Sequence, residues 1–317
     1  QLNKLGREIV QCSNQYRQDW SISYANHVFD PAVTVMLRAM KRYAVDIGKE
    51  LVGNGLQSYA MAKLLQRLTR FARRASRTWR FINAVREQEK QANSNFNSGR
   101  DLIYHLAEKH SRLLIIRIDL YFRPYYDSQR ANKEINGYLR WLRSKACKRN
   151  LLPGYLSFMI KRENGLVRGT HWHLLVVCDG NLQRNGGYLT QQLGEMWAQR
   201  TEQGRVSYHN CWADRAKYEY DGLGVMELDD WEKMVGLRSA LYYMSKHDCV
   251  LKVTNDKVKN FWRSPIQKRS GGKRGKPRMD DDSLRMLKRM LGGKRSKYPP
   301  GFQPAPRAKR HMSASAA

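Results

Sequence analysis

The sequence predicts an α+β fold, in which helices come first, an antiparallel sheet follows and a basic tail ends the chain. Up to residue 98, apolar residues recur at intervals of three and four, as on one face of a helix. From residue 100, several short segments alternate apolar and polar residues, as half-buried strands do. From residue 266, 15 Lys and Arg stand against three Asp among Gly and Pro clusters, which favours a flexible segment. We therefore expect a helical basic region at 1–98, an α+β domain at 99–265 and a basic, flexible tail at 266–317.

The N-terminal region holds two predicted helices, Pro31–Asp46 and Leu56–Lys90. One face of the second helix is basic, because its cationic residues recur every three or four positions: Lys63, Arg67, Arg70, Arg74 and Arg77. A charge run is usually a solvated surface, but arginine without matching glutamate also fits contact with phosphates, and both interpretations stay open. The polar segment Asn93–Gly99 predicts a break and a domain boundary.

The predicted sheet begins with Leu113–Phe122, where Arg117, Asp119 and Tyr121 share the more polar face. Gly154–Glu163 and Thr170–Cys178 alternate in the same way, and the Asn-Gly pair between them predicts a β-hairpin. A further short strand is expected at 225–228 after an irregular segment. Helices are expected at 132–148, 188–201 and 230–246, with a short one at 283–291 in the tail.

The charge of the chain points to a polyanionic partner. Lys and Arg number 58 against 28 Asp and Glu, a formal net charge of +30, and neutralising phosphates releases condensed counterions. A basic protein of another kind would show the same balance, so charge alone says nothing about chemistry. The sequence holds no run of 18 apolar residues, so no membrane span is expected. Gln1–Gln18 lacks the apolar run of a signal peptide. Five scattered cysteines without a C-x-x-C pair argue against a disulfide framework and fit a reducing cytoplasm.

A candidate metal site lies on the predicted hairpin. His171 and His173 are two apart on a strand, so their side chains point to one face. Glu163 ends the preceding strand on its polar face, where the turn brings it beside His171. Two imidazoles and one carboxylate leave coordination positions open, as in catalytic sites. The mixed ligands suit Mg²⁺ or Mn²⁺, and zinc also binds such donors. Trp172 points to the opposite face and is expected in the core.

A candidate nucleophile lies on the last predicted helix. Tyr243 and Lys246 are three apart and share a helix face. A phenol has a pKa near ~10, and a neighbouring ammonium favours the phenolate. Tyr242 is the competing nucleophile, with Ser245 as its partner at the same spacing. An isolated Y-x-x-K is more often one core aromatic residue and one surface lysine.

Together these motifs resemble a family. The order E-x₇-H-W-H on a hairpin, followed by Y-x-x-K on a later helix, resembles the HUH endonucleases. Within them, the segments GYLSFMIKRENGLVRGTHWHLLVVCDG and LYYMSK are similar to inovirus-type replication proteins of filamentous phages and prophages. In conjugative relaxases the tyrosine precedes the histidines, so the order here favours a replication initiator. The resemblance covers about residues 100–262.

The resemblance implies a fold and a mechanism. It implies an antiparallel sheet with helices on one face, a ferredoxin-like palm, and the other face open for DNA and metal. Glu163, His171 and His173 would bind the divalent ion, and Tyr243, assisted by Lys246, would cut single-stranded DNA to leave a 5′-phosphotyrosine and a free 3′-OH. Arg117, Asp119 and Tyr121, on one face of the first strand, would line the DNA path or support the metal site. Rolling-circle replication in a bacterial cytoplasm would then need a host helicase and polymerase, since the sequence holds no phosphate-binding G-x-x-x-x-G-K-[ST] loop.

Other functions explain part of the pattern. A non-enzymatic DNA-binding prophage regulator explains the charge, and a nuclease that uses water explains the metal ligands without Tyr243. A single-tyrosine HUH transposase shares the motif order. Neither the DNA site, the oligomeric state nor the type of mobile element follows from the sequence.

Overall fold

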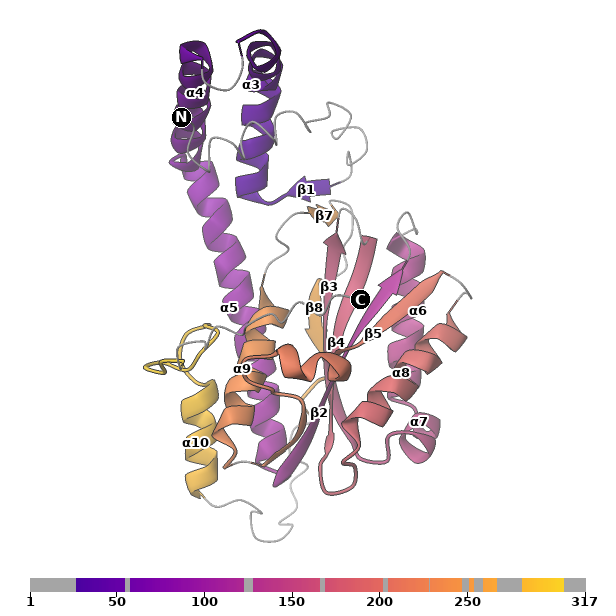
Figure 1. Ribbon diagram of the computed structural model, residues 1–317. Helices are drawn as coiled ribbons and strands as arrows, with labels where there is room; N and C mark the ends of the chain where they lie inside the picture. The colour runs from indigo at the N-terminus through magenta and orange to yellow at the C-terminus, as the bar shows by residue number, and fades with distance from the viewer. Residues whose placement is uncertain are drawn as a thin grey trace, which may run out of the picture.

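The computed structural model of the protein describes residues 27–54, 58–122, 128–165, 169–201, 205–227, 229–246, 251–253, 259–266 and 281–304. A six-stranded antiparallel sheet lies at its centre, with helices packed on it and a helical hairpin beyond one end (Figure 1). This mixed helical and antiparallel architecture agrees with the predicted α+β class. The expectations for residues 1–26 lie outside the described residues.

The sheet is built around the long strand β2 (Arg112–Phe122). Its order is β5–β2–β4–β3–β8, and β6 pairs with the other half of β2; the bounds are Val206–Asn210 for β5, Gly169–Asp179 for β4, Tyr155–Gly165 for β3, Phe261–Arg263 for β8 and Gly224–Glu227 for β6. The predicted hairpin of β3 and β4 is present, and Glu163 pairs with His171 in it. On the other side of β4, His173 pairs with Asp119 of β2. Paired residues point to the same face, so the register gathers these side chains.

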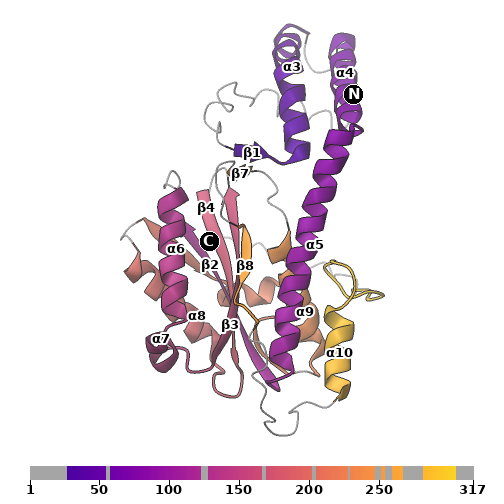
Figure 2. The same ribbon diagram turned by 180° about the vertical axis from the view of Figure 1, so that it is seen from behind.

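Helices cover both faces of the sheet, so the expectation of helices on one face is wrong. One face packs against α6 (Ser128–Leu142), α7 (Lys145–Asn150) and α8 (Gly186–Arg200), and Trp172 is fully buried there as predicted. The other face packs against α5 (Trp79–Ala107) and α9 (Trp231–Ser245), and α10 (Asp281–Leu291) packs on the outer side of these two helices (Figure 2). The reason is that Leu113 and Ile115 of β2 are apolar on this second face and are buried under helices. Only the part of this face that carries Arg117, Asp119 and Tyr121 is polar.

The predicted break at Asn93–Gly99 is wrong, because α5 runs through it without interruption. Phe96 is fully buried, and the absence of a side chain at Gly99 lets α5 approach Leu241 of α9 closely. The polar residues of this segment lie on the exposed side of the same helix. The boundary expected at residues 98 and 99 therefore falls inside a helix.

The N-terminal helices form a separate small core. Helix α3 (Pro31–Asn54) and helix α4 (Tyr59–Ser76) pack together through Ala39, Ile47 and Leu68. The helix predicted at Leu56–Lys90 is divided in two, since Thr78 caps the start of α5. Strand β1 (His27–Phe29) pairs with β7 (Leu251–Val253) beside the helical hairpin of α3 and α4. This helical hairpin lies beyond the sheet, at the N-terminal end of α5 (Figure 2).

The short helix expected at 283–291 in the tail is present as α10, but the chain after it, around Lys294–Lys297, also packs against the fold, where a flexible segment is expected. Helix α10 buries Leu287 and Leu291 completely. Arg238, also fully buried, donates from Nη1 and Nη2 to the carbonyl oxygens of Met290 (3.2 Å), Gly292 (2.8 Å) and Lys294 (2.8 Å). These bonds satisfy carbonyl groups at and beyond the end of α10, where a cation is favourable. The charge count predicts a flexible tail, but the regularly spaced apolar residues of α10 are buried and hold this segment against the fold.

The remaining expectations concern cysteines and membranes. Cys147, Cys178 and Cys211 are buried free thiols, while Cys12 and Cys249 lie outside the described residues. None of the helices in the described ranges has the length and apolar character needed to cross a bilayer.

Candidate metal and nucleophile site

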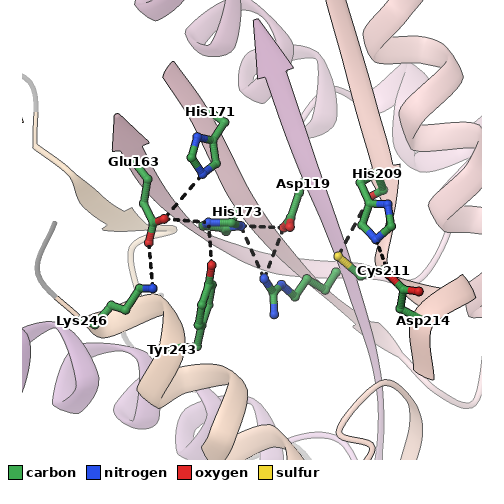
Figure 3. A network of polar contacts seen from close by, with 10 residues as sticks. Asp119, Glu163, His171, His173, His209, Cys211, Asp214, Tyr243 and Lys246 are labelled. Carbon is green, nitrogen blue, oxygen red and sulfur yellow. Dashed lines mark hydrogen bonds and ion pairs between the residues drawn. The ribbon is translucent and has the colours of Figure 1, made fainter. Parts of the chain in front are cut away.

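The three predicted ligands meet on the polar part of the sheet face. Glu163 Oε2 lies 3.5 Å from His171 Nε2 and 3.3 Å from His173 Nε2. One potential ligand atom from each of the three residues lies within 4.8 Å of the other two. The side chains point toward one another from the neighbouring strands β3 and β4 (Figure 3). A group with this spacing could hold a metal ion.

Asp119 fixes the orientation of His173. Its Oδ1 accepts from His173 Nδ1 at 2.7 Å, and both side chains are buried. This contact leaves Nε2 as the ring nitrogen that faces Glu163, the arrangement of ligand histidines held by a carboxylate. Burial opposes the charged carboxylate, but Arg117 and the hydrogen bond from His173 lower the pKa of Asp119 to about 2. Asp119 is therefore a permanent acceptor at neutral pH.

The donor set fits a divalent cation. Glu163 Oε1 is buried and accepts no hydrogen bond from the described residues. The cation nearest to this oxygen is the Lys246 ammonium, at 3.7 Å, so the carboxylate keeps capacity to bind a metal ion. Burial disfavours ionisation, but His171 and His173 hold the pKa of the Glu163 carboxyl far below its usual range. Two imidazoles and one ionised carboxylate leave positions for water or substrate, as a catalytic site requires.

Tyr243 approaches this group from the last turn of α9. Its hydroxyl lies 3.3 Å from His173 Nε2, and the two rings meet edge to face at 5.0 Å. Lys246 Nζ lies 4.1 Å from the centre of the Tyr243 ring and 3.7 Å from Glu163 Oε1. Burial and the nearby Glu163 carboxylate raise the pKa of Tyr243 to about 12. The phenol is therefore protonated at neutral pH unless further positive charge is added.

Tyr242 points elsewhere. Its ring packs under the guanidinium of Arg295, 4.2 Å from the ring centre, and its carbonyl accepts from the same arginine at 3.2 Å. The sequence left Tyr242 and Tyr243 as competing nucleophiles on spacing alone. In the structure it is the Tyr243 hydroxyl that contacts a candidate metal ligand.

Arg117 belongs to this site, and its side chain is 13 % exposed. Its Nη2 lies 3.4 Å from Asp119 Oδ1, and its guanidinium lies 4.7 Å from the centre of the Tyr243 ring. Of the two roles predicted for it, this geometry favours support of the site over a free contact with DNA.

The other predicted DNA contacts lie away from this site. We call them, together with Lys63, the α4 basic stripe: Lys63, Arg67, Arg70, Arg74 and Arg77. All five are exposed, four of them on α4 and Arg77 at its C-cap, in the helical hairpin beyond the sheet (Figure 1).

Sequence patterns underestimated two residues. Lys161 is almost fully buried, and its Nζ donates to the carbonyl oxygen of Lys246 at 2.5 Å, at the end of α9. Its alternation with Glu163 on β3 was the only available signal. The sequence indicates Asp119 only as one of three residues on a strand face that would line the DNA path or support the metal site, without naming its partner. Its pairing with His173 depends on which strand neighbours β4, and the alternation of one strand does not contain that information.

Comparison of the chain with family models, with curated proteins and with solved structures finds no match. The geometry of the site is therefore the basis on which a function can be proposed.

Proposed function

We propose that this protein is a metal-dependent endonuclease of the HUH type that nicks and rejoins single-stranded DNA through Tyr243. The observation that carries this proposal is the 3.3 Å separation between the Tyr243 hydroxyl and Nε2 of His173. A nucleophile-bearing side chain thus adjoins the atom that His173 offers as a metal ligand. A regulator that only binds DNA has no need for this juxtaposition, and a nuclease that uses water has no need for a tyrosine there.

The residues have complementary roles in this chemistry. Glu163, His171 and His173 would hold Mg²⁺ or Mn²⁺, which supplies positive charge to phosphate oxygens and to an attacking oxygen. Tyr243 forms a bond from its phenol oxygen to phosphorus while the bond to the 3′ oxygen breaks. The phenol loses its proton, the 3′ oxygen gains one, and the 5′ phosphate stays on the tyrosine. Lys246, over the ring, stabilises the negative charge of this exchange.

The covalent product suits replication or transposition. The phosphodiester is conserved as a phosphotyrosine, so a later 3′-OH can displace it and reseal the strand. The free 3′-OH can meanwhile prime a polymerase. A rolling-circle replication initiator of a phage or mobile element, working in a bacterial cytoplasm with a host helicase and polymerase, uses both properties. The net charge of +30 supports a polyanionic partner.

A covalent-adduct assay tests the proposal. The full chain is incubated with labelled single-stranded hairpin oligonucleotides and Mn²⁺, and the products are separated on a denaturing gel. We expect an adduct with the wild type that disappears in Tyr243→Phe and in His173→Ala. The matched variant Tyr242→Phe, which keeps its ring and loses only a hydroxyl, should still form the adduct.

Each alternative has its own outcome in this assay. An adduct lost in Tyr242→Phe and kept in Tyr243→Phe would identify Tyr242 as the nucleophile. Strand cleavage without any adduct would identify a nuclease that uses water. DNA binding without cleavage, over a panel of origin-like hairpins, would contradict the proposed nuclease activity.

A further inference from the structure

A cavity of about 370 Å³ shares a wall with the candidate site, because Tyr243 and Arg117 line both. We call it the tyrosine pocket. Three segments form its other walls: the loop after the 3₁₀ helix η1 (Cys211–Lys217), helix α9, and the C-terminal segment around Lys297. Ligand sites are typically concave spaces of about this size, with apolar walls and few polar groups.

The loop that forms one wall is held firmly against α9. Asp221 accepts from Arg215 Nε at 2.7 Å and from Lys233 Nζ at 2.8 Å. Gly222 and Gly236 bring the two backbones so close that a Cβ on either would lie 2.2 Å from a backbone nitrogen. No other residue fits at these two positions without moving the wall. The pocket is therefore preformed, which lowers the ordering cost of binding.

The C-terminal segment completes the pocket. Lys297 Nζ donates to Glu219 Oε2 at 3.0 Å. Tyr220 packs edge to face against Tyr298 at 6.3 Å and against Phe302 at 5.5 Å. The segment expected to be a flexible tail is thus part of a wall beside the candidate nucleophile. A wall assembled from such distant parts of the chain is a specific feature of this fold.

The lining combines aromatic rings with cations. Tyr218 and Tyr220 present rings and Leu223 an aliphatic surface. The Lys217 and Lys297 side chains are 76 % and 46 % exposed, and each ammonium is ion-paired, with Asp214 and with Glu219. Aromatic rings stack on bases of any sequence, and lysines in such exposed, weak pairs can turn to a phosphate. This is the chemistry that recognises a nucleotide.

We propose that the tyrosine pocket binds one unstacked nucleobase of the DNA strand, next to the phosphate that Tyr243 attacks. The inference rests on the proposed function for the identity of that strand. Within one nucleotide, base and phosphate are adjacent, so a base in the pocket positions the neighbouring phosphodiester at the shared wall formed by Tyr243. The pocket then aligns the substrate and contributes to the choice of cleavage position.

The first test measures binding without catalysis. Deoxynucleoside 5′-monophosphates are titrated into the full chain by saturation-transfer NMR, with deoxyribose 5-phosphate as the probe that lacks a base. Ala240→Phe puts a ring into the pocket from α9, and Ala213→Phe is the same change at an exposed position of η1. We expect Ala240→Phe to weaken binding about tenfold, within the roughly 5- to 150-fold range of one stacked base. If the monophosphates bound equally to Ala240→Phe and Ala213→Phe, or if deoxyribose 5-phosphate bound as tightly as they do, the proposal of a base-binding pocket would be overturned.

A second measurement uses the wild type, in case Ala240→Phe does not fold. Lysine acetylation is followed by mass spectrometry with and without the monophosphate. Lys217 and Lys297 should be protected, while the exposed Lys145 should react at its ordinary rate. Protection equal at all three lysines would mean binding by charge alone and would overturn the inference.

The covalent-adduct assay separates the two proposals. Adduct formation by a protein whose pocket binds no monophosphate leaves the nuclease standing and removes the pocket. Base-dependent binding that Ala240→Phe abolishes, in a protein that never forms an adduct, leaves the pocket and removes the nuclease. If both stand, one abasic position near the cut should lower adduct formation in the wild type and have no further effect in Ala240→Phe.

Discussion

Replacing Asp119 by asparagine should weaken metal binding without removing any ligand. Asp119 is the carboxylate that accepts from His173 Nδ1 at 2.7 Å, on the side of the ring away from Glu163. Asp119→Asn keeps the shape of the side chain and an acceptor oxygen. It removes the negative charge that holds the imidazole in its ligand orientation and makes it more basic.

The size of the effect follows from this one contact. A hydrogen bond to a charged group contributes about 1.5–3 kcal/mol and a neutral one about 0.5–1.5 kcal/mol. The difference of about 1–1.5 kcal/mol corresponds to roughly tenfold in the dissociation constant. Arg117, which lies 3.4 Å from Asp119, also loses its charged partner, so its positive charge is no longer balanced beside the site. We therefore expect a loss of about 10- to 100-fold, the range typical of such outer partners.

The assay is isothermal titration of the full chain with Mn²⁺ at neutral pH. The chain offers a matched control in Asp214→Asn, because Asp214 makes the same contact with His209 Nε2, also at 2.7 Å (Figure 3). Asp214→Asn should bind Mn²⁺ as the wild type does. If Asp119→Asn retained wild-type affinity within twofold while remaining folded by urea titration, the orienting role of Asp119 would be refuted.

Three further outcomes follow from other parts of the molecule. Changing the four arginines of the α4 basic stripe to glutamine should reduce the slope of log K against log[KCl] for single-stranded DNA binding by about 2.8, at ~0.7 per phosphate contact. Anisotropy titrations at several KCl concentrations measure this slope, and an unchanged slope would mean that the stripe is a solvated surface. Arg238→Met leaves carbonyl oxygens at the end of α10 unsatisfied, so the free energy of unfolding in urea should fall by about 2–5 kcal/mol; a loss below 1 kcal/mol would contradict its capping role. Burial opposes ionisation of Asp221, but hydrogen bonds from Arg215 and Lys233 outweigh it and lower its pKa. The stability that Asp221 contributes is therefore present above its unfolded pKa of ~3.9 and is lost as pH falls toward the folded pKa; Asp221→Asn should be less stable than the wild type at pH 7, with a difference that narrows at pH 3, and a constant difference would contradict the assignment.

The candidate site was predictable because its signals are local. The alternation of β3 and β4 and the Asn-Gly turn between them are enough to place Glu163 beside His171. The spacing also pairs Tyr243 with Lys246, but Lys246 is the C-cap of α9 with a non-helical backbone, so their contact depends on how the helix ends. The distance between these two groups depends on how α9 lies over the sheet, and no periodicity contains it. The same limit applies to Asp119, whose partner is set by strand order.

The errors in the fold have a common physical cause. Composition was used where burial decides: Asn93–Gly99 is polar on average, but Phe96 anchors it in a helix. The chain after α10 belongs to a basic segment, but Tyr298 and Phe302 pack against Tyr220. The resemblance implies an open second face of the sheet, but Leu113 and Ile115 on that face are apolar and helices cover them. In each case a few apolar side chains outweigh the average composition of the segment around them.

The division of one sheet face into an apolar and a polar part explains where the candidate site lies. Helix α9 crosses the apolar part and ends where the polar part begins, because apolar residues of the sheet are needed to hold it. Its last turn therefore delivers Tyr243 to the ligands on β3 and β4. Lys161 secures this end, since its ammonium group binds the Lys246 carbonyl at 2.5 Å. The Lys161 contact thus fixes the end of α9 that carries Tyr243, the candidate nucleophile.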